Sequence, residues 1–257
     1  MYPVLIRLGP LEIPTYGVLL AIGIALALYT ASRRARLVDL PGDRIADLGL
    51  WVVLWGLAGA KLLLVVTDPS YLGSLHALWG LVRAGGVFYG GLIGAVVAAV
   101  ILLRRYRLPF LPVADVLAPS VALGHFFGRL GCFSAGCCFG APCTEPWGVV
   151  FTNPLAHEVS GTPLNVPLHP TQLYEGVFNL LNYLFLAWLF RRNLPKGTVI
   201  GAYLVTYGVA RFIIEFYRGD ADRGFVLGGA LSTSQAIAAV MVPAGIAVIV
   251  WAARRRA

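Results

Sequence analysis

The chain has 257 residues, of which 58% are hydrophobic and only 12% are charged, and its mean hydropathy is +0.78. Soluble domains carry about a quarter charged residues, so this composition excludes an ordinary soluble enzyme and places the chain among membrane proteins. The net charge of +8 does not indicate a nucleic-acid partner, because the basic residues stand beside apolar segments, where they set topology and bind lipid headgroups.

Seven apolar segments of about 20 residues, long enough to cross about 30 Å of hydrocarbon, follow one another along the chain. They predict an all-α integral membrane protein with helices at 15–30, 45–66, 86–103, 113–133, 173–190, 198–217 and 233–251. Spanning strands are disfavoured because these apolar runs are continuous rather than alternating, and open sheet edges cannot be satisfied in lipid. The first segment is not a cleavable signal peptide, since Glu12 precedes it and arginines follow it.

The basic residues orient these seven segments. Most of the 20 Lys and Arg residues follow the first, third, fifth and seventh segments: Arg33, Arg34, Arg36, Arg44, Arg104, Arg105, Arg107, Arg191, Arg192, Lys196, Arg254, Arg255 and Arg256. Four others, Arg7, Arg83, Arg218 and Arg223, fall on the opposite side. The positive-inside rule therefore predicts an outside amino terminus and an inside carboxyl terminus.

One long connection, 134–172, lies on the outer side by this topology, lacks Lys and Arg, and is rich in Pro and Gly. A connection of this length without an obvious helix or strand is usually functional. No linker or internal repeat divides the sequence, so 1–257 is interpreted as one membrane domain with an outer polar cap.

Charged residues inside the apolar segments are the first functional candidates. Arg129 lies in the fourth segment, and Arg211, Glu215 and Arg218 lie at the end of the sixth. A charge near the middle of a membrane costs roughly 3 kcal/mol, so such residues usually line a polar cavity. All four fall near the outer leaflet, where guanidinium groups suit a phosphate and the obvious phosphate is a phospholipid headgroup.

Structural roles compete with this interpretation. Arg211 and Glu215 could neutralise each other as an i, i+4 pair, and Arg218 could extend to the membrane interface. For Arg129, a purely structural role would need an ion pair with a residue on another helix. His125 shares the face of Arg129 and could be a hydrogen-bonded filler.

Other polar and small residues in the segments have simpler explanations. Asp115 is most simply a helix-end cap, and Gly90 and Gly94 are most simply sites of close helix packing.

All four cysteines, Cys132, Cys137, Cys138 and Cys143, fall within twelve residues. On the outer face a disulfide is plausible. The spacing lacks the short knuckles of structural zinc sites, and no partnered base identifies a catalytic thiol, so we expect no metal and no organic cofactor.

Six motifs resemble one family, the bacterial prolipoprotein diacylglyceryl transferases. GRLGCFSAGCCFG at 128–140 resembles the family's signature, and HPTQLYEG at 169–176 resembles its outer-loop motif. PTYG at 14–17, RAGGVFYGGLIGA at 83–95, RFIIEFYRGD at 211–220 and LSTSQ at 231–235 are similar to further motifs in the same order. The resemblance covers nearly the whole chain.

The resemblance implies a multi-pass enzyme of the bacterial inner membrane whose active site faces the outer leaflet. Its partners would be phosphatidylglycerol, the lipobox cysteine of a preprolipoprotein signal peptide, and membrane lipids. The diacylglyceryl group would pass to the cysteine thiol and glycerol phosphate would leave.

Residue by residue, the resemblance assigns Arg129 and Arg211 to the phosphate, Glu215 to orienting Arg211, and Arg218 to the cavity mouth. The remaining candidates are assigned to substrate binding: Tyr16, Gly140, His125 and His169.

Several positions depart from the family pattern. Tyr89 stands where a histidine is usual, Cys132, Ala135 and Cys137 replace Asn, Asn and Glu, and Lys61 replaces a common arginine. The resemblance therefore does not identify the proton acceptor in this chain. Tyr89 could act as a phenolate, His125 could replace the base, or the arginines could lower the pKa of the acceptor thiol. We expect the last, with Tyr89 positioning substrate; the alternative function is a divergent paralogue that binds phospholipid or precursor without turnover, or uses another acceptor.

Overall fold

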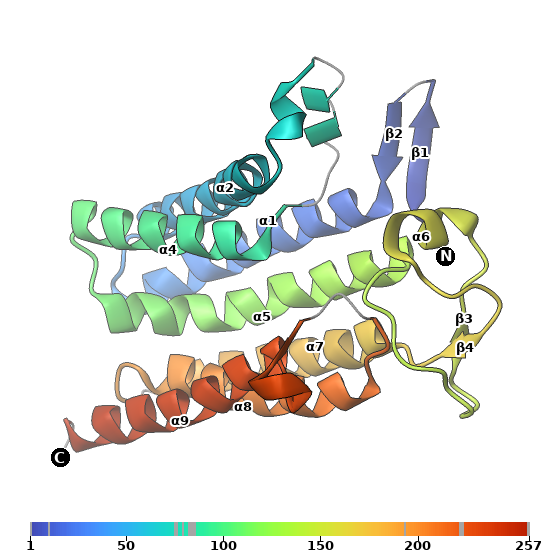
Figure 1. Ribbon diagram of the computed structural model, residues 1–257. Coiled ribbons are helices and arrows are strands. Elements are labelled where there is room, and N and C mark those ends of the chain that lie inside the picture. Colours follow the sequence, from blue (N-terminus) through green and yellow to red (C-terminus); the bar gives the residue numbers. More distant parts are fainter. Residues whose placement is uncertain are drawn as a thin grey trace. The chain divides into compact units, whose positions relative to one another are not determined.

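The computed structural model describes residues 2–9, 11–74, 77–78, 80–81, 86–192, 194–220 and 224–255 (Figure 1). It divides into two compact units, which we call unit 1 (Met1–Thr30 and Ala114–Ala257) and unit 2 (Ala31–Val113). Whether 1–257 behaves as a single domain stays a prediction. Arg83, Gly85, Arg223 and Arg256, which entered the sequence interpretation, lie outside the described residues.

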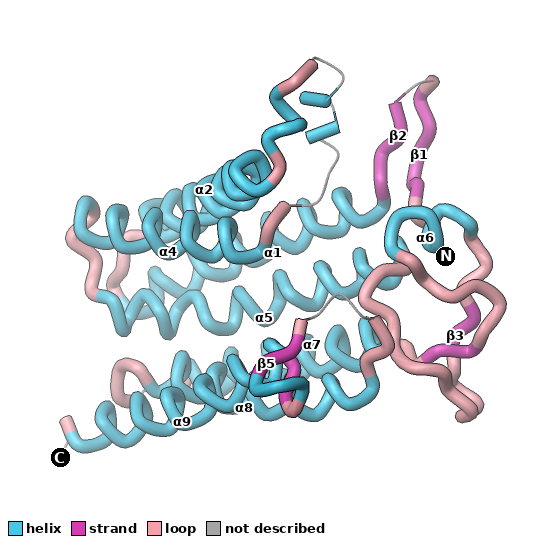
Figure 2. Tube along the Cα trace, viewed as in Figure 1, coloured by secondary structure: helices cyan, strands magenta, loops and turns pink. Residues whose placement is uncertain are grey.

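Long helices make up most of the described chain, with short strands between them (Figure 2). The α-helices are α1 (Thr15–Ala35), α2 (Gly42–Thr67), α4 (Phe88–Arg105), α5 (Phe110–Ala135), α6 (Pro154–Ser160), α7 (Thr171–Phe190), α8 (Thr198–Ile214) and α9 (Thr233–Arg254). Short 3-10 helices are η1 (Arg36–Val38), η2 (Pro69–Leu72), η3 (Glu215–Tyr217) and η5 (Leu227–Gly229). Three two-stranded antiparallel sheets, which the sequence interpretation did not anticipate, pair β1 (Val4–Leu8) with β2 (Leu11–Pro14), β3 (Val149–Val150) with β4 (Pro167–Leu168), and β5 (Phe225–Val226) with β6 (Leu231–Ser232).

Six of the described helices are long and apolar enough to cross a membrane: α1, α2, α5, α7, α8 and α9, with α1 and α8 extended by their 3-10 turns. Five of them match a predicted segment to within three residues at both ends, whereas the first runs eight residues past the predicted end of 15–30. The helical membrane class is confirmed. The remaining predicted segment corresponds to α4, which has 18 residues. Many large apolar side chains on these helices are exposed, among them Ile93, Leu62 and Val240, as expected when lipid is the solvent.

In unit 2, α2 and α4 pack through glycines. A Cβ added to Gly90 would lie 2.3 Å from the Gly59 carbonyl oxygen, and one added to Gly94 would lie 2.3 Å from the Trp55 carbonyl oxygen. Only glycine permits backbones to approach this closely, and small residues mark such interfaces in membranes. The predicted packing role of Gly90 and Gly94 is confirmed.

In unit 1, α8 packs against α9 in the same way, since a Cβ on Gly245 would lie 2.7 Å from the Gly201 carbonyl oxygen. Helix α1 approaches α5 where a Cβ on Gly23 would lie 2.6 Å from Phe127 Cβ. A buried cluster of Ala118, Ala122, Leu186 and Val199 joins α5, α7 and α8. These contacts fix the rotation of each helix and therefore decide which polar side chains meet.

The connection between α5 and α7 forms the polar cap, residues 136–170, which has a small core of its own. Phe139, Phe151 and Leu168 are buried together, and β3 pairs with β4. Asn153 caps α6, its side chain accepting a hydrogen bond from Leu155 N at 3.0 Å. The predicted loop is therefore an ordered structure rather than a chain without elements.

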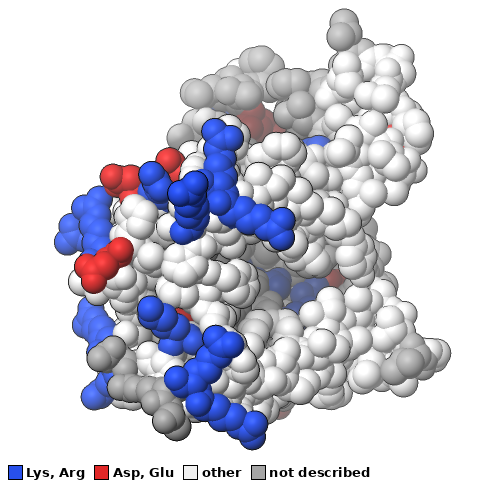
Figure 3. All heavy atoms as spheres, turned by 90° about the vertical axis from the view of Figure 1, so that its left-hand side faces the viewer, with Lys and Arg blue, Asp and Glu red and all other residues white. Residues whose placement is uncertain are grey.

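Basic side chains are concentrated at one end of each unit. In unit 1, the ends of α7 and α9 and the start of α8 meet at the end that carries Arg191, Arg192, Lys196, Arg254 and Arg255. In unit 2, Arg104 and Arg105 end α4, and Arg44 lies near the start of α2. Figure 3 looks onto a face where many Lys and Arg side chains gather. This segregation matches the clusters on which the predicted orientation depends.

Candidate active site

A buried carboxylate on α7, Glu175, collects polar side chains from two other helices of unit 1. Arg129 of α5 contacts both carboxylate oxygens through Nη2, at 2.9 Å to Oε1 and 2.8 Å to Oε2. The Tyr207 hydroxyl of α8 donates to Oε1 at 3.1 Å, and His125 Nε2 of α5 lies 3.3 Å from the same oxygen. We call these four residues the Glu175 cluster.

This cluster supplies the cross-helix ion pair that Arg129 needs. The sequence offered no acidic partner one turn away on its own helix, and Glu175 lies 46 residues further along the chain. Its side chain is only 2% exposed and that of Arg129 only 13%. Sequence reasoning did not select Glu175 or Tyr207; the signal available was the glutamate within the HPTQLYEG motif.

Arg211 and Glu215 lie one turn apart, and Arg211 Nη1 contacts Glu215 Oε2 at 2.8 Å. Arg211 Nη2 also donates to Ser234 Oγ at 2.8 Å, which connects α8 to α9 through the LSTSQ motif. The structure therefore contains the neutralising pair that the sequence left open as an alternative. The same contact is the one through which Glu215 would orient Arg211.

Arg218 is buried and forms a two-pronged ion pair with Asp220, in which Nε donates to Oδ1 at 2.8 Å and Nη2 contacts Oδ2. Burial by itself would lower the pKa of Arg218, but the hydrogen bonds to Asp220 raise it above the ordinary value. The guanidinium is therefore held in its charged state. It does not extend to the surface, as the snorkelling alternative required.

Gly140 lies where three segments of backbone cross. Its N–H donates to the His169 carbonyl at 3.0 Å, and Ala141 N donates to the Tyr217 carbonyl at 2.8 Å. A Cβ on Gly140 would lie 2.3 Å from the His169 oxygen. The structure thus gives Gly140, predicted to bind substrate, a packing role in which it joins the polar cap to the end of α8.

His169 belongs to an aromatic group at this crossing. Its Nδ1 lies 3.1 Å from the Tyr174 hydroxyl, which accepts a hydrogen bond from Trp147 Nε1 at 2.9 Å. The His169 ring also contacts the Tyr217 ring edge-on, with centroids 5.3 Å apart. Trp147 and Tyr217 are exposed, so this group presents mixed aromatic and polar surface beside the cap.

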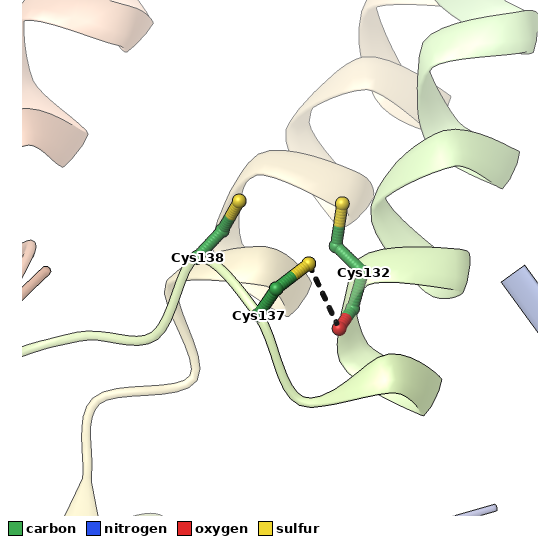
Figure 4. A group of neighbouring side chains, drawn as sticks. All are labelled: Cys132, Cys137 and Cys138. Carbon is green, nitrogen blue, oxygen red and sulfur yellow. Dashed lines mark hydrogen bonds between the residues drawn. The ribbon is translucent and has the colours of Figure 1, made fainter. Parts of the chain in front are cut away.

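The cysteines lie where α5 ends and the polar cap begins. The Sγ atoms of Cys132, Cys137 and Cys138 all lie within 4.8 Å of one another, and Figure 4 shows the three side chains grouped at the helix end. All four cysteines are free thiols, and Cys143 lies outside this group. The chain reverses through Gly136 (φ 83°) and Cys138 (φ 60°), an unusual conformation for a residue other than glycine.

The turn at 136–138, which we call the cysteine turn, is held by buried side chains on successive carbonyls. Thr162 donates to the Gly136 carbonyl at 2.6 Å, Gln172 to that of Cys137 at 2.7 Å, and Thr171 to that of Cys138 at 2.9 Å. Each of these three donors is at most 2% exposed. The HPTQLYEG motif therefore fixes this turn as well as supplying Glu175.

The pKa of the Cys138 thiol is shifted by its neighbours. Hydrogen bonds from Cys132 and Cys137 lower its pKa, and the positive charges of Arg129 and Arg218 lower it further, against the opposite effect of burial. The cysteine turn is thus electrostatically linked to both arginines.

Tyr16 and Tyr89 are on different units. Tyr16, 38% exposed, opens α1 and packs against α5, where a Cβ on Gly131 would lie 2.9 Å from its ring. Tyr89, 53% exposed, lies on α4 in unit 2 with Lys61, which donates to the Leu81 carbonyl at 2.8 Å. The role assigned to Tyr89 stays a prediction.

Asp115 is a cap, but for a helix other than its own. It lies on α5, and its carboxylate accepts from Gly197 N at 2.6 Å and Ile200 N at 2.8 Å. These N–H groups lie at the start of α8, where backbone N–H groups have no hydrogen-bond acceptor within the helix. Asp115 thereby positions the helix that carries Tyr207 and Arg211.

The fold and the site together define a class: a helical membrane protein with an ordered polar cap and buried arginines that are each paired with a carboxylate. The model of the prolipoprotein diacylglyceryl transferase family matches residues 3–251. The chain is 38% identical over 247 residues to the phosphatidylglycerol–prolipoprotein diacylglyceryl transferase of Clostridium tetani, covering 96% of each chain.

Two further relatives carry the same name. The protein of Pseudomonas paraeruginosa is 35% identical over 262 residues, covering 99% of this chain and 95% of the relative. That of Synechococcus elongatus is 34% identical over 262 residues, covering 97% and 86%. The chain belongs to the prolipoprotein diacylglyceryl transferase family, as its motifs predicted.

Proposed function

We propose that this protein transfers the diacylglyceryl group of phosphatidylglycerol to the lipobox cysteine of a preprolipoprotein, forming a thioether and releasing glycerol phosphate. Family membership over nearly the whole chain supports the reaction class and both substrates. This step is the first in maturation of a bacterial lipoprotein. It needs a group that binds the phosphate, charge stabilisation as the carbon–oxygen bond breaks, and a thiolate.

One feature of the Glu175 cluster carries the assignment of the phosphate site. Arg129 Nε is buried and has no hydrogen-bond partner among the described residues. A buried donor without an acceptor costs about 1–3 kcal/mol, so its persistence favours a ligand oxygen as the missing acceptor. Glu175 contacts Arg129 only through Nη2, which leaves the rest of the guanidinium fork for a phosphate.

The carboxylates have a positioning role in this scheme. A long arginine side chain loses about 2 kcal/mol of rotamer freedom when it is fixed, and the contacts with Glu175 and Glu215 remove that freedom before substrate arrives. Arg129 and Arg211 then stabilise the charge that develops on the leaving phosphate. Arg218 stands on the cap side of the same site.

An apolar groove between α7 and α8 is suited to an acyl chain of the lipid. Its volume is about 570 Å³, and its lining is almost wholly apolar: Tyr174, Phe178, Val205, Thr206, Val209, Ala210, Ile213 and Ile214. Tyr174 and Ala210 directly adjoin Glu175 and Arg211 in the sequence. An acyl chain lying here would bring the headgroup toward these charged residues.

We infer seven spans with the amino terminus outside and the active site facing the outer leaflet of the bacterial inner membrane. Helix α4 would be the seventh span, since 18 residues reach about 27 Å, close to the hydrocarbon thickness. The positive ends of unit 1 and unit 2 would face the cytoplasm. Arg218, the aromatic group and the polar cap would then face outward, where a lipobox cysteine is presented.

Incubation of the purified protein with phosphatidylglycerol and a lipobox peptide tests this function. Mass spectrometry should detect a diacylglyceryl thioether on the peptide together with released glycerol phosphate. A peptide with serine in place of cysteine is the matched control and should stay unmodified. Lipid binding without any thioether product would instead identify a binding paralogue and refute the enzymatic proposal.

A further inference from the structure

The three thiols of Cys132, Cys137 and Cys138 have the spacing of metal ligands. A tetrahedral zinc ion with sulfurs at about 2.3 Å holds them about 3.8 Å apart. The three Sγ atoms already lie within 4.8 Å of one another, so closure by about 1 Å completes such a site. Thiolate ligands select soft cations, Zn²⁺ foremost among the redox-inert ones.

No fourth protein ligand joins this group within the described part of the chain. Cys143 is the nearest cysteine in sequence, but its buried thiol is directed to the Glu145 carbonyl at 4.0 Å. The three clustered thiols are only partly buried. Three protein ligands with an accessible fourth position are the arrangement of catalytic rather than structural zinc sites.

The surroundings of the thiols also suit a metal. Thr162, Thr171 and Gln172 fix the carbonyls of the cysteine turn, so the backbone that carries Cys137 and Cys138 is set before an ion binds. Three thiolates and a divalent cation carry a net charge of −1, and Arg129 lies three residues before Cys132 on the same helix, α5. The cluster therefore lies beside one of the arginines proposed to bind phosphate.

We propose that Cys132, Cys137 and Cys138 bind a soft divalent cation such as Zn²⁺, and that the open fourth position takes the acceptor thiol of the precursor peptide. The second part rests on the function proposed above. The cation would replace the thiol proton, which leaves to solvent, because a thiol that coordinates zinc is deprotonated outright. The bound sulfur would then attack the glycerol carbon as its bond to the phosphate oxygen breaks, and glycerol phosphate would leave with that electron pair.

Metal content tests the site without reference to activity. The full-length protein, purified in detergent from cells supplied with zinc, should contain about one zinc per chain by elemental analysis. Replacing the zinc with Co²⁺ should produce thiolate-to-cobalt charge-transfer absorption. The variants Cys132→Ser, Cys137→Ser and Cys138→Ser should lose most of the metal, and the matched control Cys143→Ser should keep it.

Two results would overturn the metal site. One is a metal-free parent protein whose thiols are all reduced and which shows no cobalt spectrum when Co²⁺ is added. The other is a disulfide within the group, found by mass spectrometry after alkylation of the purified protein. Circular dichroism of each variant separates loss of metal from loss of fold. The cobalt spectrum of the parent protein tests the site even if a variant does not fold.

The fourth position is tested with the cobalt-loaded parent protein and the same pair of peptides. The cysteine peptide should add charge-transfer intensity, and the serine peptide should leave the spectrum unchanged. If neither peptide changes the spectrum, the acceptor-thiol role is wrong. Thioether formation by metal-free protein would overturn the inference and leave the proposed function standing. Metal binding without any thioether product would contradict the proposed function and leave the metal site standing.

Discussion

Replacing Glu175 by Gln tests the charged cluster most directly, because it keeps the side-chain shape and removes the charge. The Glu175 side chain is 2% exposed, and its carboxylate contacts Arg129, Tyr207 and His125. A glutamine offers one acceptor oxygen and no negative charge. Removing one partner of a buried ion pair costs about 3–5 kcal/mol, since the remaining charge is left uncompensated.

We therefore expect Glu175→Gln to lower the free energy of unfolding by about 3–5 kcal/mol and to reduce transferase activity strongly. Unfolding in mixed detergent micelles can be followed by the fluorescence of the six tryptophans. The matched control is Glu158→Gln on α6, where the side chain is exposed and the same change should cost less than about 0.5 kcal/mol.

The reasoning would be refuted if both variants unfolded with the same free energy. That result would mean that Arg129 does not depend on Glu175 for its compensation. A third variant, Glu175→Asp, keeps the charge on a shorter side chain and should fall between Gln and the parent protein in stability.

Three other changes test separate parts of the structure. Asp115→Ala should lower stability by about 1–2 kcal/mol in the same unfolding assay, because α8 loses its cap; an unchanged midpoint would contradict that role. Gly140→Ala should destabilise the protein or prevent its accumulation, since the added Cβ would meet backbone at 2.3 Å, whereas Gly128→Ala, with nothing within 4 Å, should leave the unfolding free energy the same or slightly higher. Tyr89→Phe should retain appreciable thioether formation, while Arg129→Ala should lose nearly all of it; equal losses would show that the Tyr89 hydroxyl takes part in the chemistry.

Some features could be read from particular residues because their causes are local. The apolar segments required helices in lipid, and the observed helices lie within a few residues of the predicted bounds, except that the first extends further at its carboxyl end. Gly90 and Gly94 were recognised as packing residues because small residues one turn apart on a membrane helix have few other uses. The two-stranded sheet of the cap and α6 were not anticipated, since 134–172 shows no apolar periodicity.

The cysteines show that separation along the chain does not predict separation in space. Cys132 precedes Cys137 by more than one helical turn, and the interval lacks the pattern of a zinc knuckle. The reversal at Gly136 and Cys138 turns the chain back on the end of α5 and brings the three sulfurs together. A positive φ at a cysteine is not foreseeable from composition, because the buried donors that hold the turn come from the polar cap and from α7.

The amino-acid sequence alone determined that this is a helical membrane protein, where its long apolar helices lie, which family it belongs to and which arginines to examine. Only the tertiary structure decided that Glu175 holds Arg129 across 46 residues, that Asp115 caps a helix 82 residues away, and that three cysteines converge. The physical reason is that periodicity and hydropathy are properties of one segment, whereas an ion pair between helices depends on how each helix is rotated against its neighbours. That rotation is set by the packing of small and large side chains over the whole of unit 1.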